Sequence, residues 1–243
     1  MPSKTREYKD QTALLPLAQN FPLFFNICFL VPVYMVASLI LEEKEKKLRE
    51  GMRMMGLSDG SYYLSWIIMF LLFVIWNCIV ATAITAINVF ENTNMFLIFI
   101  YLFFYGLATM NSILFLTSFF STQRTGQIFI TLFFVISMML QYAFQEAPGP
   151  KSVQIILSIF PNTANFFTSQ VIWGFQFENY ALSFDTVNIE TKNYTFNLGI
   201  LMFFIDFLVY GLLFLYFDKV FPNDYGVRRH PCFCFHKSTY KCG

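Results

Sequence analysis

The side chains that could do chemistry are few, and most of them lie near the C-terminus. Both histidines, His230 and His236, stand there beside Cys232, Cys234 and Cys242. Zinc sites usually separate paired cysteines by two to four residues, so a C-x-C pair with scattered histidines matches a metal site poorly. We therefore expect reduced cysteines and no bound metal in this tail.

Asp206 is the only ionisable side chain within five long apolar stretches. A charge inside a bilayer costs on the order of 3 kcal/mol unless it is paired or neutral. Asp206 could line a transport path or make a structural hydrogen bond to a neighbouring Asn, Ser or Tyr, and the sequence leaves both open. No second acid and no histidine occurs in these stretches, which disfavours a membrane-embedded enzyme that works by acid–base chemistry.

Phosphate chemistry has no motif in this sequence either. The chain contains no G-x-x-x-x-G-K-[ST] run, the loop that cradles nucleotide phosphates. We therefore expect this polypeptide by itself to bind no cofactor and to hydrolyse no ATP. A channel is also disfavoured, because no apolar stretch repeats polar residues along one face to line a pore.

The five apolar stretches define the fold class. They cover residues 20–41, 62–90, 95–120, 128–144 and 196–217, and each is about long enough to cross ~30 Å of hydrocarbon as a helix. Apolar residues make up 56% of the chain and charged residues 13%, which suits a lipid-facing surface. The sequence predicts an all-α, multi-pass integral membrane protein with five transmembrane helices. Its main partner is then the lipid bilayer, and nucleic acid is not a partner.

The basic residues orient these spans. Segments 42–61, 121–127 and 218–243 carry 11 Lys and Arg residues, whereas the segments on the other side carry 5. The positive-inside rule places the first set, including the tail at 218–243, in the cytoplasm. The single N-x-[ST] sequon, at Asn193, falls outside and predicts a glycosylation site. An outside N-terminus with no visible signal peptide suits a fragment of a longer protein.

Residues 153–177 carry no charge and could be counted as a sixth span. Pro161-Asn162 breaks this stretch into two halves that are each too short to cross, and its Asn, Gln, Ser and Thr side chains would need partners in hydrocarbon. A sixth span would also move the basic tail outside. We therefore expect a broken helical hairpin, residues 151–177, that enters the outer leaflet and returns before the last span.

A cytoplasmic amphipathic helix is expected directly after the first span, at residues 42–57. Three acid–base pairs four residues apart favour a helix, namely Glu42–Lys46, Glu43–Lys47 and Glu45–Arg49. An apolar stripe follows the same helix and comprises Leu41, Leu48, Met52 and Met55.

The same segment indicates where this helix ends and what it could contact. Gly56 is expected to end the helix, and Ser58 or Asp59 to cap the next one. The helix could lie on anionic lipid head groups, or it could dock on a soluble partner through its methionines, which adapt to irregular surfaces.

Two runs of residues carry a family resemblance. Residues 43–57, EKEKKLREGMRMMGL, followed by Ser65-Trp66, resemble an E-K-E-x-x-L-K-E-x-M-x-x-M-G-L run of the ATP-binding cassette transporters of subfamily A. Residues 206–226 match that family's D-x₃-Y-x₅-Y-x₃-V-x-P-x₂-Y-G run at every fixed position, and residues 116–121 resemble its third-to-fourth-span junction. The resemblance covers about residues 20–231, and Pro231-Cys232-Phe233-Cys234 matches the family only loosely.

The resemblance implies that residues 1–243 are one transmembrane domain, holding spans two to six of one half of a transporter. The helix at 42–57 would couple this domain to a nucleotide-binding domain through Glu43, Lys46, Lys47, Leu48, Arg49, Met52 and Met55. That domain, which is outside this chain, would use ATP and Mg²⁺, and a second transmembrane half would complete the protein. The substrate would be a lipid or sterol. An export permease of the ABC-2 type for drugs or glycans is the alternative.

Overall fold

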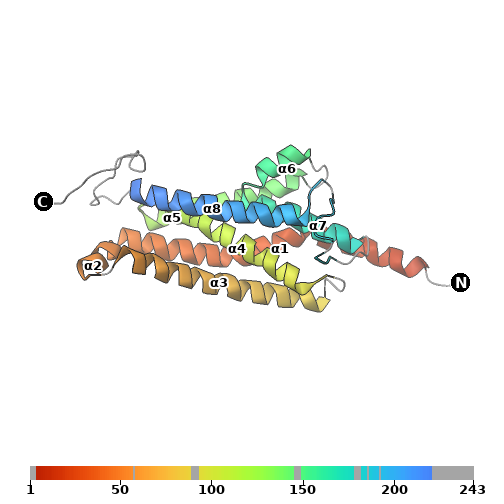
Figure 1. Cartoon of the computed structure of the whole chain (residues 1–243), viewed down its shortest axis with the longest axis horizontal. Coiled ribbons are helices and arrows are strands. Elements are labelled where there is room, and N and C mark those ends of the chain that lie inside the picture. The colour runs from red at the N-terminus through yellow and green to blue at the C-terminus, as the bar shows by residue number, and fades with distance from the viewer. Residues whose placement is uncertain are drawn as a thin grey trace.

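Within the described residues, the computed structural model has five helical segments that are long and apolar enough to cross a membrane. Four belong to α1 (Lys4–Glu45), α3 (Asp59–Asn88), α4 (Met95–Thr117) and α8 (Phe196–Val220), and the fifth is α5 (Gln123–Met139) continued by 3₁₀ residues to Phe144. Figure 1 shows these helices running lengthwise beside one another. The structure describes residues 4–56, 58–88, 93–144, 149–177, 182–184, 186–191 and 193–220. The prediction of an all-α integral membrane protein with five spans is confirmed.

Four shorter elements lie at the two ends of the bundle. The short helix α2 (Leu48–Met54) stands at one end, and the 3₁₀ helix η1 (Leu140–Phe144), α6 (Lys151–Leu157) and α7 (Pro161–Phe177) belong to the other half (Figure 1). We call these the α2 end and the α6 end. Among the described residues, the sole β-type pairing is an isolated bridge between Thr191 and Tyr194.

Helix α4 is the centre of the bundle. It contacts α8, α3, α1, α7 and α5. Gly106 lets it approach its neighbours closely, since a Cβ there would lie 2.7 Å from Val74 Cγ1 of α3 and 2.9 Å from Phe29 Cε1 of α1. Aromatic rings fill the space around it: Tyr105 packs edge-on against Phe29 of α1 and Phe203 of α8. Aromatic pairs of this geometry add to the stabilisation that comes from close packing.

The outer faces of the spans are apolar. Leu72 and Trp76 of α3 are 64% and 68% exposed, and Leu212 of α8 is 67% exposed. In water such a surface would be unstable, whereas in a bilayer it meets hydrocarbon. The bundle therefore has a lipid-facing surface of the kind that the composition predicted.

Two predicted boundaries are corrected. The first apolar span begins at Asn20, as predicted, although helix α1 itself begins earlier, at Lys4. Helix α5 begins at Gln123, so that residues 123–127 are helical rather than part of a loop. Polar residues can continue a transmembrane helix beyond the hydrocarbon, because its backbone hydrogen bonds are internal. Helix α4 ends at Thr117, three residues earlier than predicted, and Ser118 N and Phe119 N then close turns onto Phe115 O and Leu116 O.

The stretch at 151–177 forms two helices, as the sequence predicted. Pro161 is the first residue of α7, a position where the missing N–H of proline costs nothing. Every residue from 161 to 169 is buried, although five of them are Asn, Thr or Ser. Helix α7 contacts α8, α1, α4 and α5. Its polar side chains are thus enclosed by protein, while its depth in a membrane stays a prediction.

Candidate functional site

The last turn of α1 carries two neighbouring charges that bind the ends of two other helices. Lys44 Nζ donates a hydrogen bond to the Thr117 carbonyl at the C-terminus of α4, over 2.9 Å. The next residue, Glu45, accepts a hydrogen bond at Oε2 from the backbone N–H of Gln123, the first residue of α5, over 2.7 Å. Gln123 Nε2 also donates to Ser38 Oγ of α1 over 2.9 Å. The α2 end of α1 is therefore fixed to the turn between α4 and α5.

The single helix predicted over residues 42–57 is wrong, because α1 ends at Glu45 and α2 begins at Leu48. Lys47 between them has φ 56°, a left-handed conformation that interrupts a right-handed helix. Of the two predicted pairs whose side chains the structure describes, Glu42–Lys46 forms. Glu43 instead accepts a hydrogen bond at Oε2 from Tyr62 Oη of α3, over 2.8 Å. Arg49 lies in α2, and its side chain is outside the described part.

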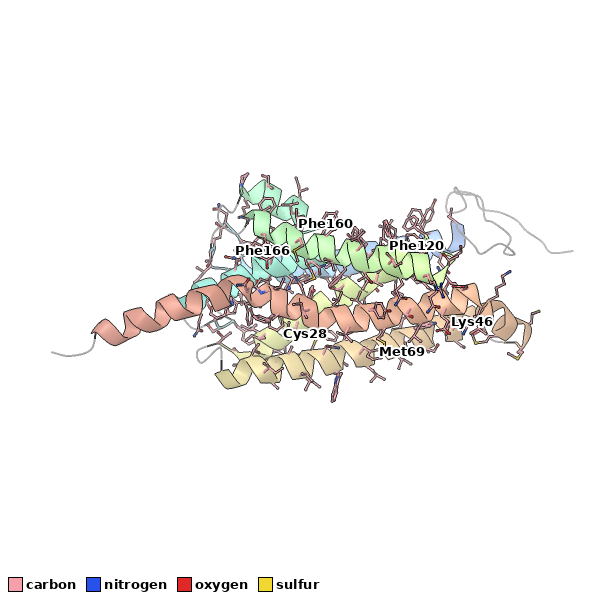
Figure 2. The ribbon with its side chains drawn as sticks, turned by 180° about the vertical axis from the view of Figure 1, so that it is seen from behind. Cys28, Lys46, Met69, Phe120, Phe160 and Phe166 are labelled. Atoms are coloured by element: carbon pink, nitrogen blue, oxygen red, sulfur yellow. The ribbon has the colours of Figure 1, made fainter. Side chains whose placement is uncertain are left out.

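Helix α2 and Met55, the residue directly after it, carry apolar side chains at the end of the bundle. Met55 is 81% exposed, Leu48 is 48% exposed, and Met52 is partly buried. Met54 is 86% exposed, and the sequence analysis missed it, because the break at Lys47 shifts the helical register away from the predicted stripe. Leu41, which that stripe included, is completely buried in the bundle. Figure 2 shows Lys46 near this end of the molecule.

The turn that leaves α2 follows the predicted signals. Gly56 has φ 94°, which only glycine adopts without strain. Ser58 Oγ then accepts a hydrogen bond from Ser61 N over 3.3 Å at the start of α3. Both the helix stop at Gly56 and the cap at Ser58 are confirmed.

A buried network of amides and phenols joins α7 to the spans. The Tyr105 hydroxyl of α4 donates a hydrogen bond shared between Asn26 Oδ1 of α1, at 2.6 Å, and Asn162 Oδ1 of α7, at 3.0 Å. Asn165 Nδ2 of α7 donates to the same Asn26 oxygen over 2.8 Å. Tyr101 Oη of α4 donates to Asn165 Oδ1. Each of these side chains is at most 4% exposed, so the network specifies how α7 sits between α1 and α4.

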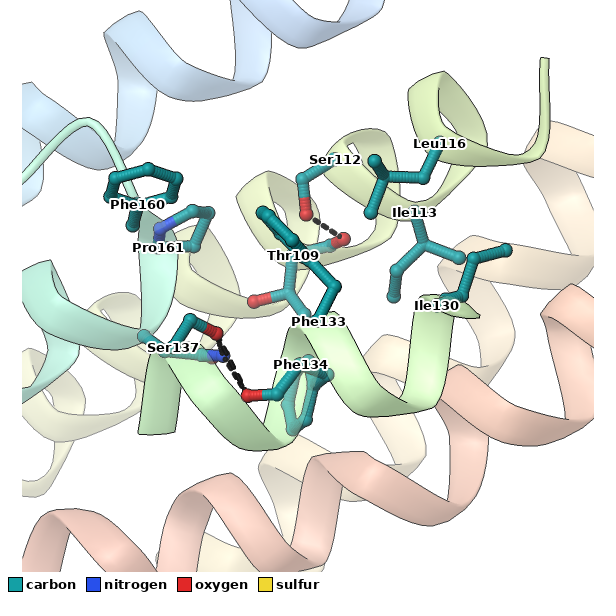
Figure 3. A pocket seen from close by; sticks show the side chains of 11 residues that line it. Thr109, Ser112, Ile113, Leu116, Ile130, Phe133, Phe134, Ser137, Phe160 and Pro161 are labelled. Carbon is teal, nitrogen blue, oxygen red and sulfur yellow. Dashed lines mark hydrogen bonds between the residues drawn. The ribbon is translucent and has the colours of Figure 1, made fainter. Parts of the chain in front are cut away.

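The network extends to α5 and borders a small pocket. Asn162 Nδ2 donates to Ser137 Oγ of α5 over 2.6 Å. The pocket lies between α4, α5 and the start of α7, and its polar lining includes Thr109, Ser112, Ser137 and Asn162 (Figure 3). Ser112 and Ser137 each donate to a carbonyl of their own helix, as the dashed lines show. The space would hold about one water molecule, which is far too small for a lipid.

Asp206 lies on α8 and is 1% exposed. Its Oδ2 accepts no hydrogen bond from the described residues, so within this part of the chain the predicted structural hydrogen bond to this oxygen is not found. Two tyrosines near Asp206 form hydrogen bonds to residues at the junction between α6 and α7. Tyr194 Oη pairs with Ser158 Oγ at 3.1 Å, and Tyr210 Oη donates to the Ile159 carbonyl over 2.9 Å.

Asn193 lies in a tight turn at the α6 end, opposite to α2. It has φ 67° and is exposed, and the neighbouring residues Thr191 and Tyr194 pair through two backbone hydrogen bonds. Thr195 Oγ1 accepts a hydrogen bond from Leu198 N and caps α8. Glycosylation of Asn193 stays a prediction. The cysteines and histidines of the C-terminal tail lie outside the described residues.

Comparison with known proteins identifies the family. The family model described as ABC-2 family transporter protein matches residues 3–216. The retinal-specific phospholipid-transporting ATPase ABCA4 of Bos taurus is 25% identical over 228 residues, which cover 90% of this chain and 10% of that protein. The cholesterol transporter ABCA5 of Mus musculus is 28% identical over 211 residues, covering 85% and 12%. The ATP-binding cassette sub-family A member 17 of Rattus norvegicus is 26% identical over 225 residues, covering 89% and 13%.

The match to the family model covers most of the chain, while the chain spans only about a tenth of the length of these curated relatives. The five apolar helices agree with a membrane-spanning domain. The chain is therefore an integral, multi-pass membrane protein that belongs to the ABC-2 family of transporter proteins, with subfamily A ABC transporters among its relatives.

Proposed function

We propose that this chain is the membrane-spanning part of an ATP-driven transporter that moves lipids or sterols. Two of its relatives are named as a phospholipid-transporting ATPase and a cholesterol transporter. The exposed faces of α3 and α8 are apolar, so the acyl chains or rings of such a substrate could stay in hydrocarbon while it moves. ATP and Mg²⁺ would be bound by a nucleotide-binding domain outside this chain, and a second transmembrane half would complete the transporter.

The observation that supports coupling to ATP hydrolysis is the exposed apolar surface formed by α2 and Met55, the residue after it. Met54 and Met55 are both more than four-fifths exposed at the tip of the molecule, where the positive-inside rule predicts cytoplasm. Methionine side chains at such a position suit a soluble partner with an irregular surface. We assign this surface, together with Lys46, Lys47, Leu48, Arg49 and Met52, to the nucleotide-binding domain.

A charge placed in this surface tests the proposal. Met54→Asp and Met55→Asp are introduced together into the full-length protein, which is reconstituted in phosphatidylcholine vesicles with a fluorescent phospholipid. In these variants two methionines are no longer buried against the nucleotide-binding domain. ATP-dependent lipid movement should therefore fall by more than about tenfold. The matched control changes both residues to Leu, which keeps the surface apolar and should transport at close to the parent rate.

Two results would refute the proposal. The first is a parent protein that moves neither phospholipid nor a fluorescent sterol when ATP is supplied. The second is a double Asp variant that transports as fast as the double Leu variant, because α2 would then not be the surface through which ATP hydrolysis acts.

A further inference from the structure

Three consecutive residues at the end of α1 each contact a different helix. Glu43 binds Tyr62 of α3, Lys44 binds the last carbonyl of α4, and Glu45 binds the first N–H of α5. Of these residues, the sequence suggested Glu43 and Glu45 for pairing along one helix and Glu43 also for docking on a partner, whereas it gave no role to Lys44. In the structure they are hydrogen-bonded to the helices of the bundle, whereas Met54 and Met55 are highly exposed.

The signs of two of these charges match the helix ends that they meet. A helix N-terminus carries partial positive charge and a C-terminus partial negative charge. The Glu45 carboxylate lies at the N-terminus of α5, and the Lys44 ammonium lies at the C-terminus of α4. Thr122, the N-cap residue of α5, makes no side-chain capping bond of its own. Glu45 thus supplies from another helix the cap that α5 lacks.

The same segment is continuous with α2. Only Lys46 and Lys47 separate Glu45 from the first residue of α2, and this turn is closed by hydrogen bonds from Lys46 N to Glu42 O and from Lys47 N to Lys44 O. A displacement of α2 therefore acts directly on the residues that hold α3, α4 and α5. A flexible linker would absorb such a displacement, whereas a hydrogen-bonded turn transmits it.

We infer that Glu43, Lys44 and Glu45 form a clamp that passes movement of α2 to the start of α3 and to the turn between α4 and α5. They are positioning residues and do not bind the nucleotide-binding domain. The assignment of a transmitting role rests on the proposed function, whereas the capping of α5 by Glu45 does not.

Proline at position 123 removes the key donor selectively. Proline is favoured at the first position of a helix, and Thr122 before it has φ −105° and ψ 135°, a conformation that a following proline prefers. Gln123→Pro therefore keeps the start of α5 at this residue and does not change Glu45. It removes the backbone N–H that donates the hydrogen bond to Glu45. Gln123→Ala is the matched control, because it loses the bond to Ser38 and keeps that N–H.

Two measurements on the full-length protein decide the inference. In Gln123→Pro, hydrogen exchange in the first turn of α5 should quicken about fivefold, as expected for loss of a helix cap. Lipid moved per ATP hydrolysed should fall by a similar factor while ATP hydrolysis itself is retained, and Gln123→Ala should change neither. Glu45→Gln should lie much closer to the parent than to Glu45→Ala, because its amide oxygen accepts a hydrogen bond from the same N–H and only the interaction of the charge with the helix end is lost. Glu45→Ala should behave as Gln123→Pro.

The alternatives give different results. If Glu45 instead contacts a partner through its charge, Glu45→Gln will lose ATP hydrolysis as fully as Glu45→Ala, and the clamp is refuted. Unchanged exchange in both Gln123→Pro and Glu45→Ala refutes it as well. If the parent moves no lipid, the proposed function fails, and the exchange measurement still decides whether Glu45 caps α5.

Discussion

Gly199 of α8 should not tolerate a side chain, because α7 packs directly against it. A Cβ at this position would lie 2.2 Å from Thr168 Oγ1 and 2.9 Å from Thr168 Cγ2. Thr168 is completely buried, and its hydroxyl donates to the Ala164 carbonyl over 2.8 Å. The threonine therefore cannot turn away from a new methyl group without losing that hydrogen bond.

The size of the effect follows from three contributions. Overpacking of a buried contact costs about 1–3 kcal/mol. Loss of the Thr168 hydrogen bond adds about 1 kcal/mol, and the better helix propensity of alanine returns up to about 1 kcal/mol. Gly199→Ala should thus destabilise the fold by about 1–3 kcal/mol, which lowers the unfolding temperature by about 3–9 °C in a domain of this size.

Thermal unfolding of the purified protein in detergent measures this change. Adding Thr168→Ala to Gly199→Ala should recover most of the loss, because the two nearest clashing atoms are removed and Thr168 Cβ, the third nearest atom, lies at 3.1 Å. Gly60→Ala in α3 is the matched control, since nothing lies within 4 Å of its new Cβ. If Gly199→Ala unfolds at the same temperature as Gly60→Ala, then α7 does not pack on α8 as described.

Two further predictions concern Asp206 and Asn193. Asp206→Asn should leave the unfolding temperature unchanged or raise it, because a carboxylate that is charged in hydrocarbon costs on the order of 3 kcal/mol and Oδ2 has no hydrogen bond to a described residue to lose; a drop of several degrees would show that this oxygen is bonded. Expression with microsomes should add one glycan to the parent chain and none to Asn193→Gln, and an unmodified parent whose C-terminal tail is reached by lumenal reagents would reverse the predicted orientation.

The clamp and the buried network stabilise different ends of the same bundle. The network around Tyr105 holds α7 among the spans at the α6 end, and the charges of α1 hold the helix ends at the α2 end. An unpaired amide or hydroxyl in hydrocarbon is costly, so the network fixes a single arrangement of these helices. The helices that a movement of α2 would displace are therefore held at the α2 end by the charges of α1 and at the α6 end by the network.

The sequence by itself determined the elements of this protein. Long uncharged stretches without a central proline and without many polar side chains indicated the spans, because a helix satisfies its own backbone in lipid. Pro161 marked the start of α7, Gly56 marked the end of the segment after α1, and Ser58 marked the cap of α3, since each acts through local backbone geometry. The family resemblance likewise came from runs of neighbouring residues, and the match to the family model confirmed it.

Tertiary structure decided which partners the polar side chains take. Lipid and protein interior are both apolar, so the pattern of a span does not show which face is buried. The acid–base spacing in residues 42–57 predicted pairs along one helix, yet Glu43 is bonded to Tyr62 of α3 and Glu45 to Gln123 of α5. Asn165 looked costly in hydrocarbon and is instead enclosed by α1 and α4. Contacts between distant segments depend on how the helices pack, and no local spacing encodes that.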